Sequence, residues 1–369
     1  MPSSGSVVVL PDLPAPAAPV LESRKSAVTI KDVGKVAGVH FTTVSLALRD
    51  HPSLPASTRQ RIREVAEKMG YVRNPVFAAL THFHLRGRVR AVAPRIGYLV
   101  NHTLDRGAAL YQLQRQTLLG ALEQARLLGF DFEVVGVQEH GFDPERLAAF
   151  LESRHITGIV LAGFDPRLDS IALDWTRYSV VKIDSLHMEP QAPVVGSDHR
   201  GDVRLALKRL QQLGYRRIGL AVGRADEDAT ERLYSAGYLL EQRTIPEEDK
   251  VPELMLPYEC TVAQAGALVG KWIRRHRVDA VMCNWPVIGE MLASAGLRVP
   301  RDVACVSLCL LKQDGRMAGV YRNPRVIGAK AVALVNTLLK SGERGVPEFA
   351  SRTYVRSQWH DGESAPVKA

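Results

Sequence analysis

The 369-residue chain has few cysteines and no long apolar run. Its four cysteines, Cys260, Cys283, Cys305 and Cys309, form no CxxC pair and have no histidine at ligand spacing, so we expect buried, reduced thiols and no metal site. No stretch of about eighteen apolar residues could span a membrane, and the first 23 residues contain no Lys or Arg to begin a signal peptide. These absences predict a cytoplasmic protein with no membrane partner.

The common signatures of enzymes are also missing. No GxGxxG follows an apolar run, and GxxxxGK[ST], GxSxG and HExxH do not occur. Asp184 and the pair Asp198 and His199 stand alone, as turn and capping residues usually do. We therefore expect no catalytic residues, no cofactor and no enzymatic activity.

Positive charge is concentrated near the N-terminus. Residues 24–95 contain fourteen Lys and Arg and four Asp and Glu, whereas the remainder of the chain is almost neutral. A local excess of this kind is typical of proteins that bind a polyanion, because neutralised phosphates release counterions.

The same stretch has the pattern of three short helices. From Val28 to Tyr71, three groups of apolar residues recur at helical spacing: Ile30, Val33 and Ala37; Val44, Ala47 and Leu48; Ile62, Val65, Ala66 and Met69. Gly38 permits a tight turn between the first two helices. This is helix-turn-helix spacing, although a three-helix bundle with a solvated polar face would show the same periodicity.

The stretch resembles the headpiece of the lactose-repressor (LacI) family of bacterial transcription regulators. The resemblance depends on T-I-K-D-V-x-K-x-A-G-V at Thr29 to Val39, T-V-S at Thr43 to Ser45, T-R at Thr58 and Arg59, and G-Y-x-x-N-P at Gly70 to Pro75. It implies a recognition helix in the major groove of an operator. The candidate DNA contacts are Thr29, His40, Phe41, Thr42, Thr43, Ser45, Leu46, Arg49, Thr58, Arg73, Asn74 and Leu80.

Leu46 departs from the family, and the spacing of Phe41 conflicts with its family position. Leu46 stands where an arginine often reads guanine, and it can pack only on a thymine methyl group. Phe41 lies three residues before Val44, which would place it in the core, yet the matching family position faces the groove. We follow the family position. Leu80 falls where the family's paired hinge helices insert a leucine into the minor groove; a linker packed on the next domain is the alternative.

From Arg95 onward, short apolar runs alternate with helical stretches, from RIGYLV near the start to RTYVRSQW near the end. Such a pattern predicts parallel sheets with helices on both faces, and the length exceeds one sheet. V-x-S-D at Val195 to Asp198 and P-x-x-x-G-x-x-A-V at Pro324 to Val332 extend the resemblance. The predicted fold is an all-α helix-turn-helix headpiece followed by an α/β, periplasmic-binding-protein-like core of two doubly wound parallel-sheet lobes.

The predicted organisation has four parts. Residues 1–26, rich in Pro and Ala, form a disordered tail, for which a partner-binding proline motif is the alternative reading. Residues 27–73 form the headpiece, 74–94 the hinge helix and linker, and 95–369 the two-lobed domain for effector binding and dimerisation.

The resemblance also implies an effector site between the lobes. Its candidates are Asn101, His102, Arg232, Tyr234, Asn284, Trp285 and Cys309. Here Trp285 replaces the usual Asp after Asn284, and Ser307 to Leu310 replace the usual Gly-Phe-Asp-Asp, so two carboxylate acceptors for sugar hydroxyls are lost. Tyr234 occupies the spacing of the usual Arg, and Arg232 lies two residues before it. Trp285 either stacks on a sugar or fills the pocket.

We therefore expect a homodimeric repressor that reads a palindromic operator in double-stranded DNA. A small molecule in the cleft, such as a sugar, modulates it, or that control has been lost. A sugar-binding receptor is the remaining alternative, but it would lack the basic headpiece.

Overall fold

The structure of the protein is a computed structural model that describes residues 30–48, 54–69, 94–100, 109–137 and 143–368. Contacts divide the chain into two units, Met1–Val89 and Arg90–Ala369. The predicted tail (1–26) and almost all of the predicted hinge and linker (74–94) lie outside the described residues, so those boundaries stay predictions. No described helix is long and apolar enough to cross a membrane.

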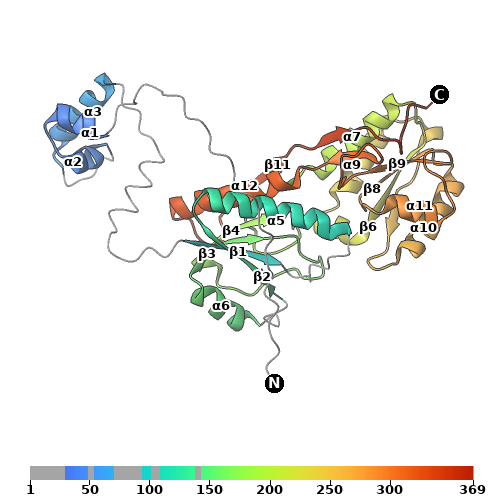
Figure 1. The fold of residues 1–369 in the computed structure, drawn as a ribbon, viewed down its shortest axis with the longest axis horizontal. Helices are drawn as coiled ribbons and strands as arrows, with labels where there is room; N and C mark the ends of the chain where they lie inside the picture. The colour runs from blue at the N-terminus through green and yellow to red at the C-terminus, as the bar shows by residue number, and fades with distance from the viewer. Residues whose placement is uncertain (1–29, 49–53, 70–93, 101–108, 138–142, 369) are drawn as a thin grey trace. The chain divides into compact units, whose positions relative to one another are not determined.

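The headpiece consists of α1 (Ile30–Ala37), α2 (Phe41–Ala47) and α3 (Ala56–Lys68) (Figure 1). The three predicted apolar stripes meet in one small core, whose buried members are Val33, Ala37, Val44, Ala47, Ile62 and Ala66. Gly38, with a φ of +66°, makes the turn between α1 and α2. At Gly34 an added Cβ would lie 2.8 Å from the carbonyl oxygen of Val39, so α1 and the turn can approach closely only without a side chain there.

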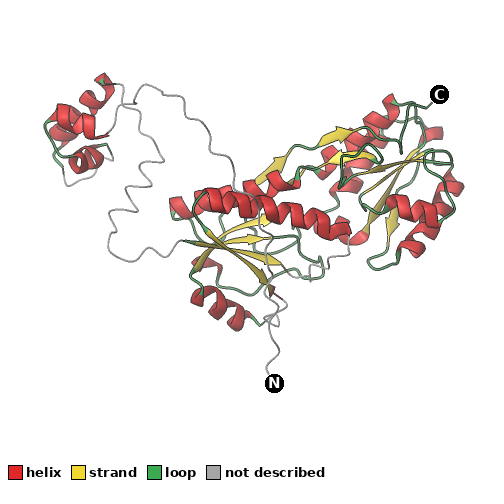
Figure 2. Ribbon diagram, in the orientation of Figure 1, coloured by secondary structure: helices red, strands yellow, loops and turns green. Residues whose placement is uncertain are grey.

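The first lobe of the core is built on a six-stranded sheet with the order β11-β5-β4-β3-β1-β2. Its strands, all parallel, are β1 (Arg95–Val100), β2 (Asp131–Gly136), β3 (Ile156–Leu161), β4 (Ser179–Ile183), β5 (Val194–Ser197) and β11 (Arg352–Val355). Helices α5 (Ala109–Leu127) and α12 (Pro324–Ser341) pack on one face, and α6 (Pro144–Ser153) contributes to the core on the other (Figure 2). A one-turn 3-10 helix, Trp175–Arg177, precedes β4.

The second lobe repeats this plan around a sheet with the order β12-β10-β9-β8-β6-β7. Its strands are β6 (Ile218–Gly223), β7 (Leu254–Leu256), β8 (Ala280–Cys283), β9 (Ala304–Ser307), β10 (Ala318–Tyr321) and β12 (Gln358–His360). On one face lie α7 (His199–Gln212) and α9 (Leu233–Gln242), and on the other α10 (Val262–His276) and α11 (Ile288–Ser294). The short helices α8 (Arg224–Ala229) and Glu247–Asp249 complete the lobe.

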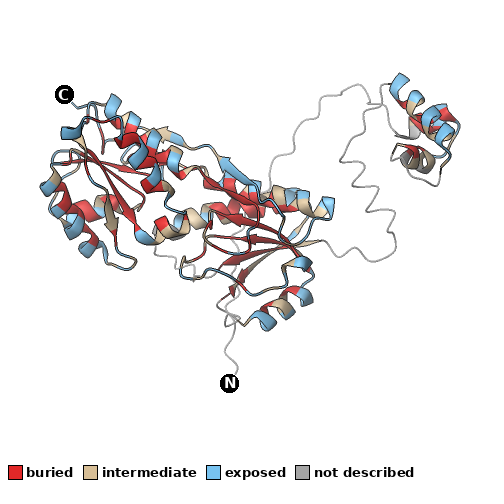
Figure 3. Cartoon of the chain, turned by 180° about the vertical axis from the view of Figure 1, so that it is seen from behind, coloured by how far each residue is buried: buried red, intermediate tan, exposed pale blue. Residues whose placement is uncertain are grey.

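The predicted fold class is confirmed, with one exception to the parallel arrangement. The edge strand β12 runs antiparallel to β10. In both lobes the central strands are buried between their helices, as continuous apolar runs such as IGLAVG require (Figure 3). The edge strands β2, β7, β11 and β12 are partly exposed.

The chain passes between the lobes three times, after β5, after β10 and after β11. The stretch RTYVRSQW, which the sequence pattern treats as one unit, is therefore divided between β11 in the first sheet and β12 in the second. Side chains near these crossings are in a position to contact both lobes.

Candidate DNA interface and interlobe site

The candidate DNA interface is centred on α2. Val44 and Ala47 are buried in the headpiece core, and Thr43 and Leu46 are half-buried. His40 is exposed just before the helix, and its ring centroid lies 4.2 Å from that of Phe41. Phe41 is half-buried and does not belong to the buried core cluster, despite its spacing from Val44.

The other predicted DNA contacts are described only in part. Thr58 lies half-buried in α3, and Thr42 and Ser45 belong to α2. The side chains of Thr42 and Ser45 lie outside the described part of the structure, and so do Thr29, Arg49, Arg73, Asn74 and Leu80 entirely.

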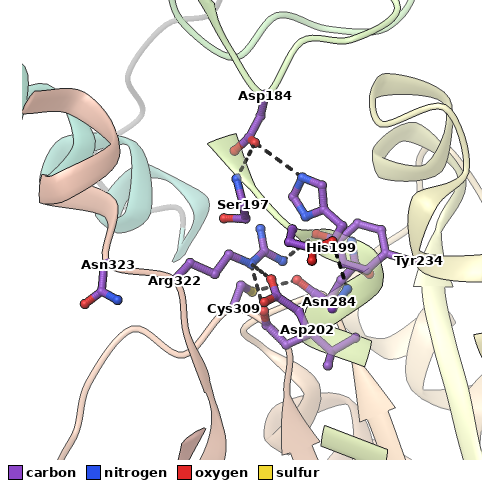
Figure 4. A network of polar contacts seen from close by, with 12 residues as sticks. Asp184, Ser197, His199, Asp202, Tyr234, Asn284, Cys309, Arg322 and Asn323 are labelled. Atoms are coloured by element: carbon purple, nitrogen blue, oxygen red, sulfur yellow. Dashed lines mark hydrogen bonds and ion pairs between the residues drawn. The ribbon is translucent and has the colours of Figure 1, made fainter. Parts of the chain in front are cut away.

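A second group of polar side chains lies in the core, close to the chain crossings (Figure 4). Asp184 follows β4 of the first lobe, whereas His199 begins α7 of the second lobe. The Nε2 atom of His199 lies 3.3 Å from Oδ1 of Asp184, which also accepts a hydrogen bond of 3.0 Å from the amide of Ser197. Burial disfavours the charge on Asp184, but His199, Arg322 and the Ser197 amide outweigh it and lower the pKa of this carboxyl group.

Arg322 is the cation of this group. Its Nε donates a 2.8 Å hydrogen bond to the carbonyl oxygen of Leu308 and lies 3.6 Å from Oδ2 of Asp202. A terminal guanidinium nitrogen donates to the hydroxyl of Tyr234, and the guanidinium carbon lies 5.5 Å from the centroid of that ring. Burial raises the pKa of Asp202, because Arg322 and His199 offset only part of the desolvation.

Tyr234 joins these two parts of the group. Its ring centroid lies 4.7 Å from that of His199, and only 2% of the tyrosine is exposed. Contacts therefore run without a break from Asp184 in the first lobe, through His199 and Tyr234, to Arg322 and Asp202. We call these five residues the crossing cluster.

Three predicted effector residues border the crossing cluster at the ends of β8 and β9. The side-chain oxygen of Asn284 accepts a 3.1 Å hydrogen bond from the amide of Gly223, and the sulfur of Cys309 lies 2.6 Å from the carbonyl oxygen of Asn284. Burial raises the pKa of Cys309 to about 11, so the thiol stays protonated. Trp285 is half-buried, and its indole nitrogen donates a 2.9 Å hydrogen bond to Asp226.

The remaining predicted effector residues do not join this group. Arg232 is exposed, and its backbone is in the left-handed region with a φ of +60°. No described side-chain contact joins Arg232 to the crossing cluster. Asn101 and His102 lie outside the described residues.

Four members of the crossing cluster were not predicted as site residues: Asp184, His199, Asp202 and Arg322. Asp198 caps α7 through a 3.0 Å hydrogen bond to the amide of Gly201, as its capping interpretation requires. The interpretation of Asp184 and His199 as isolated positions was wrong, because the fold pairs them across the lobes. Arg322 could have been identified as a candidate from the sequence, because it is a charged residue directly after the apolar strand AGVY.

The lobes also contact each other outside the crossing cluster. The amide of Leu186 donates a 3.0 Å hydrogen bond to the carbonyl oxygen of Ala229. Arg352 lies 3.0 Å from Glu231, and Arg167 lies 2.8 Å from Glu259. These two ion pairs are largely exposed, so each contributes little to holding the lobes together.

The described residues contain no group of three or more His, Cys, Asp or Glu side chains that could hold a metal ion. The cysteines form no disulfide, and Cys283, Cys305 and Cys309 are buried as predicted, whereas Cys260 is only half-buried.

Known proteins resemble this chain in both units. Residues 29–74 match the family described as "Bacterial regulatory proteins, lacI family". The "HTH-type transcriptional regulator reg1" of Streptomyces lividans is 27% identical over 303 residues, covering 75% of this chain and 79% of that protein.

Solved structures share the fold. A structure described as "transcriptional regulator CelR-cellobiose complex" superposes with a TM-score of 0.55 and 21% identity, over 91% of this chain and 99% of that one. The structure of the lac repressor dimer bound to operator and an anti-inducer superposes with a TM-score of 0.53 and 18% identity, over 92% of this chain and 100% of that one. Residues 29–74 thus form a headpiece of the lacI family of bacterial regulatory proteins, and a relative named as a transcription regulator aligns with 75% of the chain.

Proposed function

We propose that the protein is a transcription repressor that binds a palindromic operator as a homodimer. The observation that carries this proposal is the three-helix headpiece, which matches the lacI family at residues 29–74 and lies within the basic part of the chain. Two identical headpieces in a symmetric dimer would read two half-sites related by the same symmetry. Such a protein acts on DNA inside the cell and catalyses no reaction.

The proposed DNA contacts are those that the family resemblance implies. They are Thr29, His40, Phe41, Thr42, Thr43, Ser45, Leu46, Arg49, Thr58, Arg73, Asn74 and Leu80. Leu46 would contact a thymine methyl group instead of a guanine, since its side chain has no hydrogen-bond donor. The operator should therefore differ at this base pair from operators that an arginine reads.

Footprinting of genomic fragments tests this function. We expect protection of an inverted repeat, with affinity reduced about tenfold by Thr43→Ala and abolished by Leu80→Gly. Ser57→Ala, at an exposed position of α3, is the matched control and should bind as the wild type does. No protected palindrome, or binding unaffected by Thr43→Ala and Leu80→Gly, would contradict the proposal.

We further propose the interlobe cleft as the site of effector control, with Asn101, His102, Arg232, Tyr234, Asn284, Trp285 and Cys309 as its candidate contacts. The solved CelR structure was obtained as a cellobiose complex, which makes sugars the first class to test. A ligand that binds only the folded core must raise its melting temperature. A thermal-shift screen in which no sugar raises it would favour the second possibility, a regulator without small-molecule control.

A further inference from the structure

Arg322 lies where a doubly wound lobe ordinarily receives a ligand. It directly follows β10, and the neighbouring strands β6, β8 and β9 end at Gly223, Cys283 and Ser307. In such sheets small molecules bind outside the carboxyl ends of the strands. Here an arginine of the chain itself stands at this edge, and only 7% of it is exposed.

The contacts of Arg322 are of the kind that a bound cationic or hydrogen-bonding molecule would make. Its guanidinium group has an acceptor at the Leu308 carbonyl, a carboxylate at Asp202, and both the hydroxyl and the ring of Tyr234. Three segments therefore contact this one side chain, which itself lies in the crossing after β10: the end of β9, α7 and α9.

Three polar side chains near Arg322 also have partners within the protein. Asn284 accepts from the Gly223 amide, Cys309 contacts the Asn284 carbonyl, and the Trp285 indole donates to Asp226. An added Cβ at Gly223 would lie 2.4 Å from the indole nitrogen of Trp285, so this ring packs directly on the end of β6. Asn284, Cys309 and Trp285 are thus bound within the protein, whereas the Oγ atom of Ser197 and the Nδ1 atom of His199 are buried without a hydrogen-bond partner among the described residues.

The charges explain why the arrangement is stable. Asp202 is 2% exposed, and a buried carboxylate without a cation is costly. Arg322 supplies that cation, and its contact with Tyr234 continues through His199 to Asp184 of the first lobe. The position of one side chain is thus tied to the contact between the lobes.

We propose that Arg322 serves as an internal ligand, which fills the strand-end site and holds the lobes in their DNA-binding arrangement with no small molecule bound there. The proposal rests on the proposed function and specifies how its interlobe site is regulated. Arg322 acts as a positioning residue, because it works through Tyr234, His199 and Asp184 and touches no DNA.

Chemical rescue of the purified full-length protein tests the internal ligand. Arg322→Ala should lower operator affinity about tenfold, within the usual range of coupling between sites, and leave a space for a free guanidinium group. Methylguanidinium chloride should then raise the melting temperature and operator affinity of this variant above the values in equal sodium chloride. It should do neither for the wild type or for Arg325→Ala, in which the lost arginine lies on α12 and pairs with Glu123 and Gln116.

A second variant tests the proposal in case Arg322→Ala does not fold. Arg322→Met combined with Asp202→Asn removes both buried charges together, and should remain folded by circular dichroism while losing operator affinity to the same degree. Wild-type affinity in this double variant would overturn the proposal, as would a stoichiometric small molecule extracted from the denatured wild-type protein. If the wild type protects no operator, the proposed function itself fails, and the rescue of thermal stability still reports on Arg322.

Discussion

Single residues in this core hold charges that burial makes costly, and Lys182 is the clearest case. It lies in β4 with no exposed surface, and its ammonium group donates to the carbonyl oxygen of Met188. Burial lowers the pKa of Lys182 to about 8; Arg352 lowers it further, and Glu189 and Glu231 do not compensate.

Lys182→Met is therefore expected to stabilise the protein. The folded state binds fewer protons than the unfolded state between pH 8 and 10.5, so the wild-type stability should rise with pH across this window. At pH 7 the variant avoids most of the free-energy cost of burying the ammonium charge but loses one hydrogen bond. Its free energy of unfolding should therefore exceed that of the wild type by about 1–2 kcal/mol.

Urea unfolding at pH 7 and at pH 10 measures this effect. The difference between Lys182→Met and the wild type should shrink at the higher pH. Lys208→Met, at an exposed position of α7, is the control and should change stability little. A variant less stable than the wild type at pH 7 would show that the Met188 contact outweighs the cost of burial.

At the scale of elements, α5 and α12 approach so closely that their backbones touch. An added Cβ at Gly328 of α12 would lie 1.9 Å from the carbonyl oxygen of Thr117 in α5, and one at Gly120 of α5 would lie 2.0 Å from the carbonyl oxygen of Arg325. The pair of helices can cover its face of the first sheet only with glycine at both places.

Gly328→Ala should consequently force the two helices apart and lower the free energy of unfolding by about 3 kcal/mol, because backbone atoms cannot yield as a flexible side chain can. Thermal unfolding of the core measures the loss. Val326→Ala, in the same helix at a position that is 44% exposed, should have little effect. Equal melting temperatures for Gly328→Ala and the wild type would refute the close approach.

At the scale of the whole molecule, the two units differ in charge. The excess of Lys and Arg lies in residues 24–95, and the part beyond is almost neutral. Operator affinity should therefore fall by about a hundredfold or more between 50 and 200 mM salt, because each phosphate contact releases counterions.

Fluorescence anisotropy with operator DNA, repeated across this salt range, gives the dependence. The melting temperature of the core over the same range is the control and should change far less. Affinity that stays constant with salt would mean that the basic excess does not contact phosphates.

Much of this architecture could be predicted because periodicity is a local property. The headpiece stripes at Val33, Val44 and Ile62 depend on neighbours a few residues away. RTYVRSQW was misread as one unit because nothing in its composition indicates that the chain changes sheets at Arg356 and Ser357.

The sequence by itself determined the family of the helix-turn-helix headpiece, the location of the positive charge and the class of the core, since motifs, periodicity and composition are local properties of the chain. Only the tertiary structure decided what occupies the strand-end site. Asp184, His199, Asp202, Tyr234 and Arg322 are separated by up to 138 positions, and three crossings of the chain between the lobes bring them into contact. Burial then makes each charge depend on its partner, which no local pattern can encode.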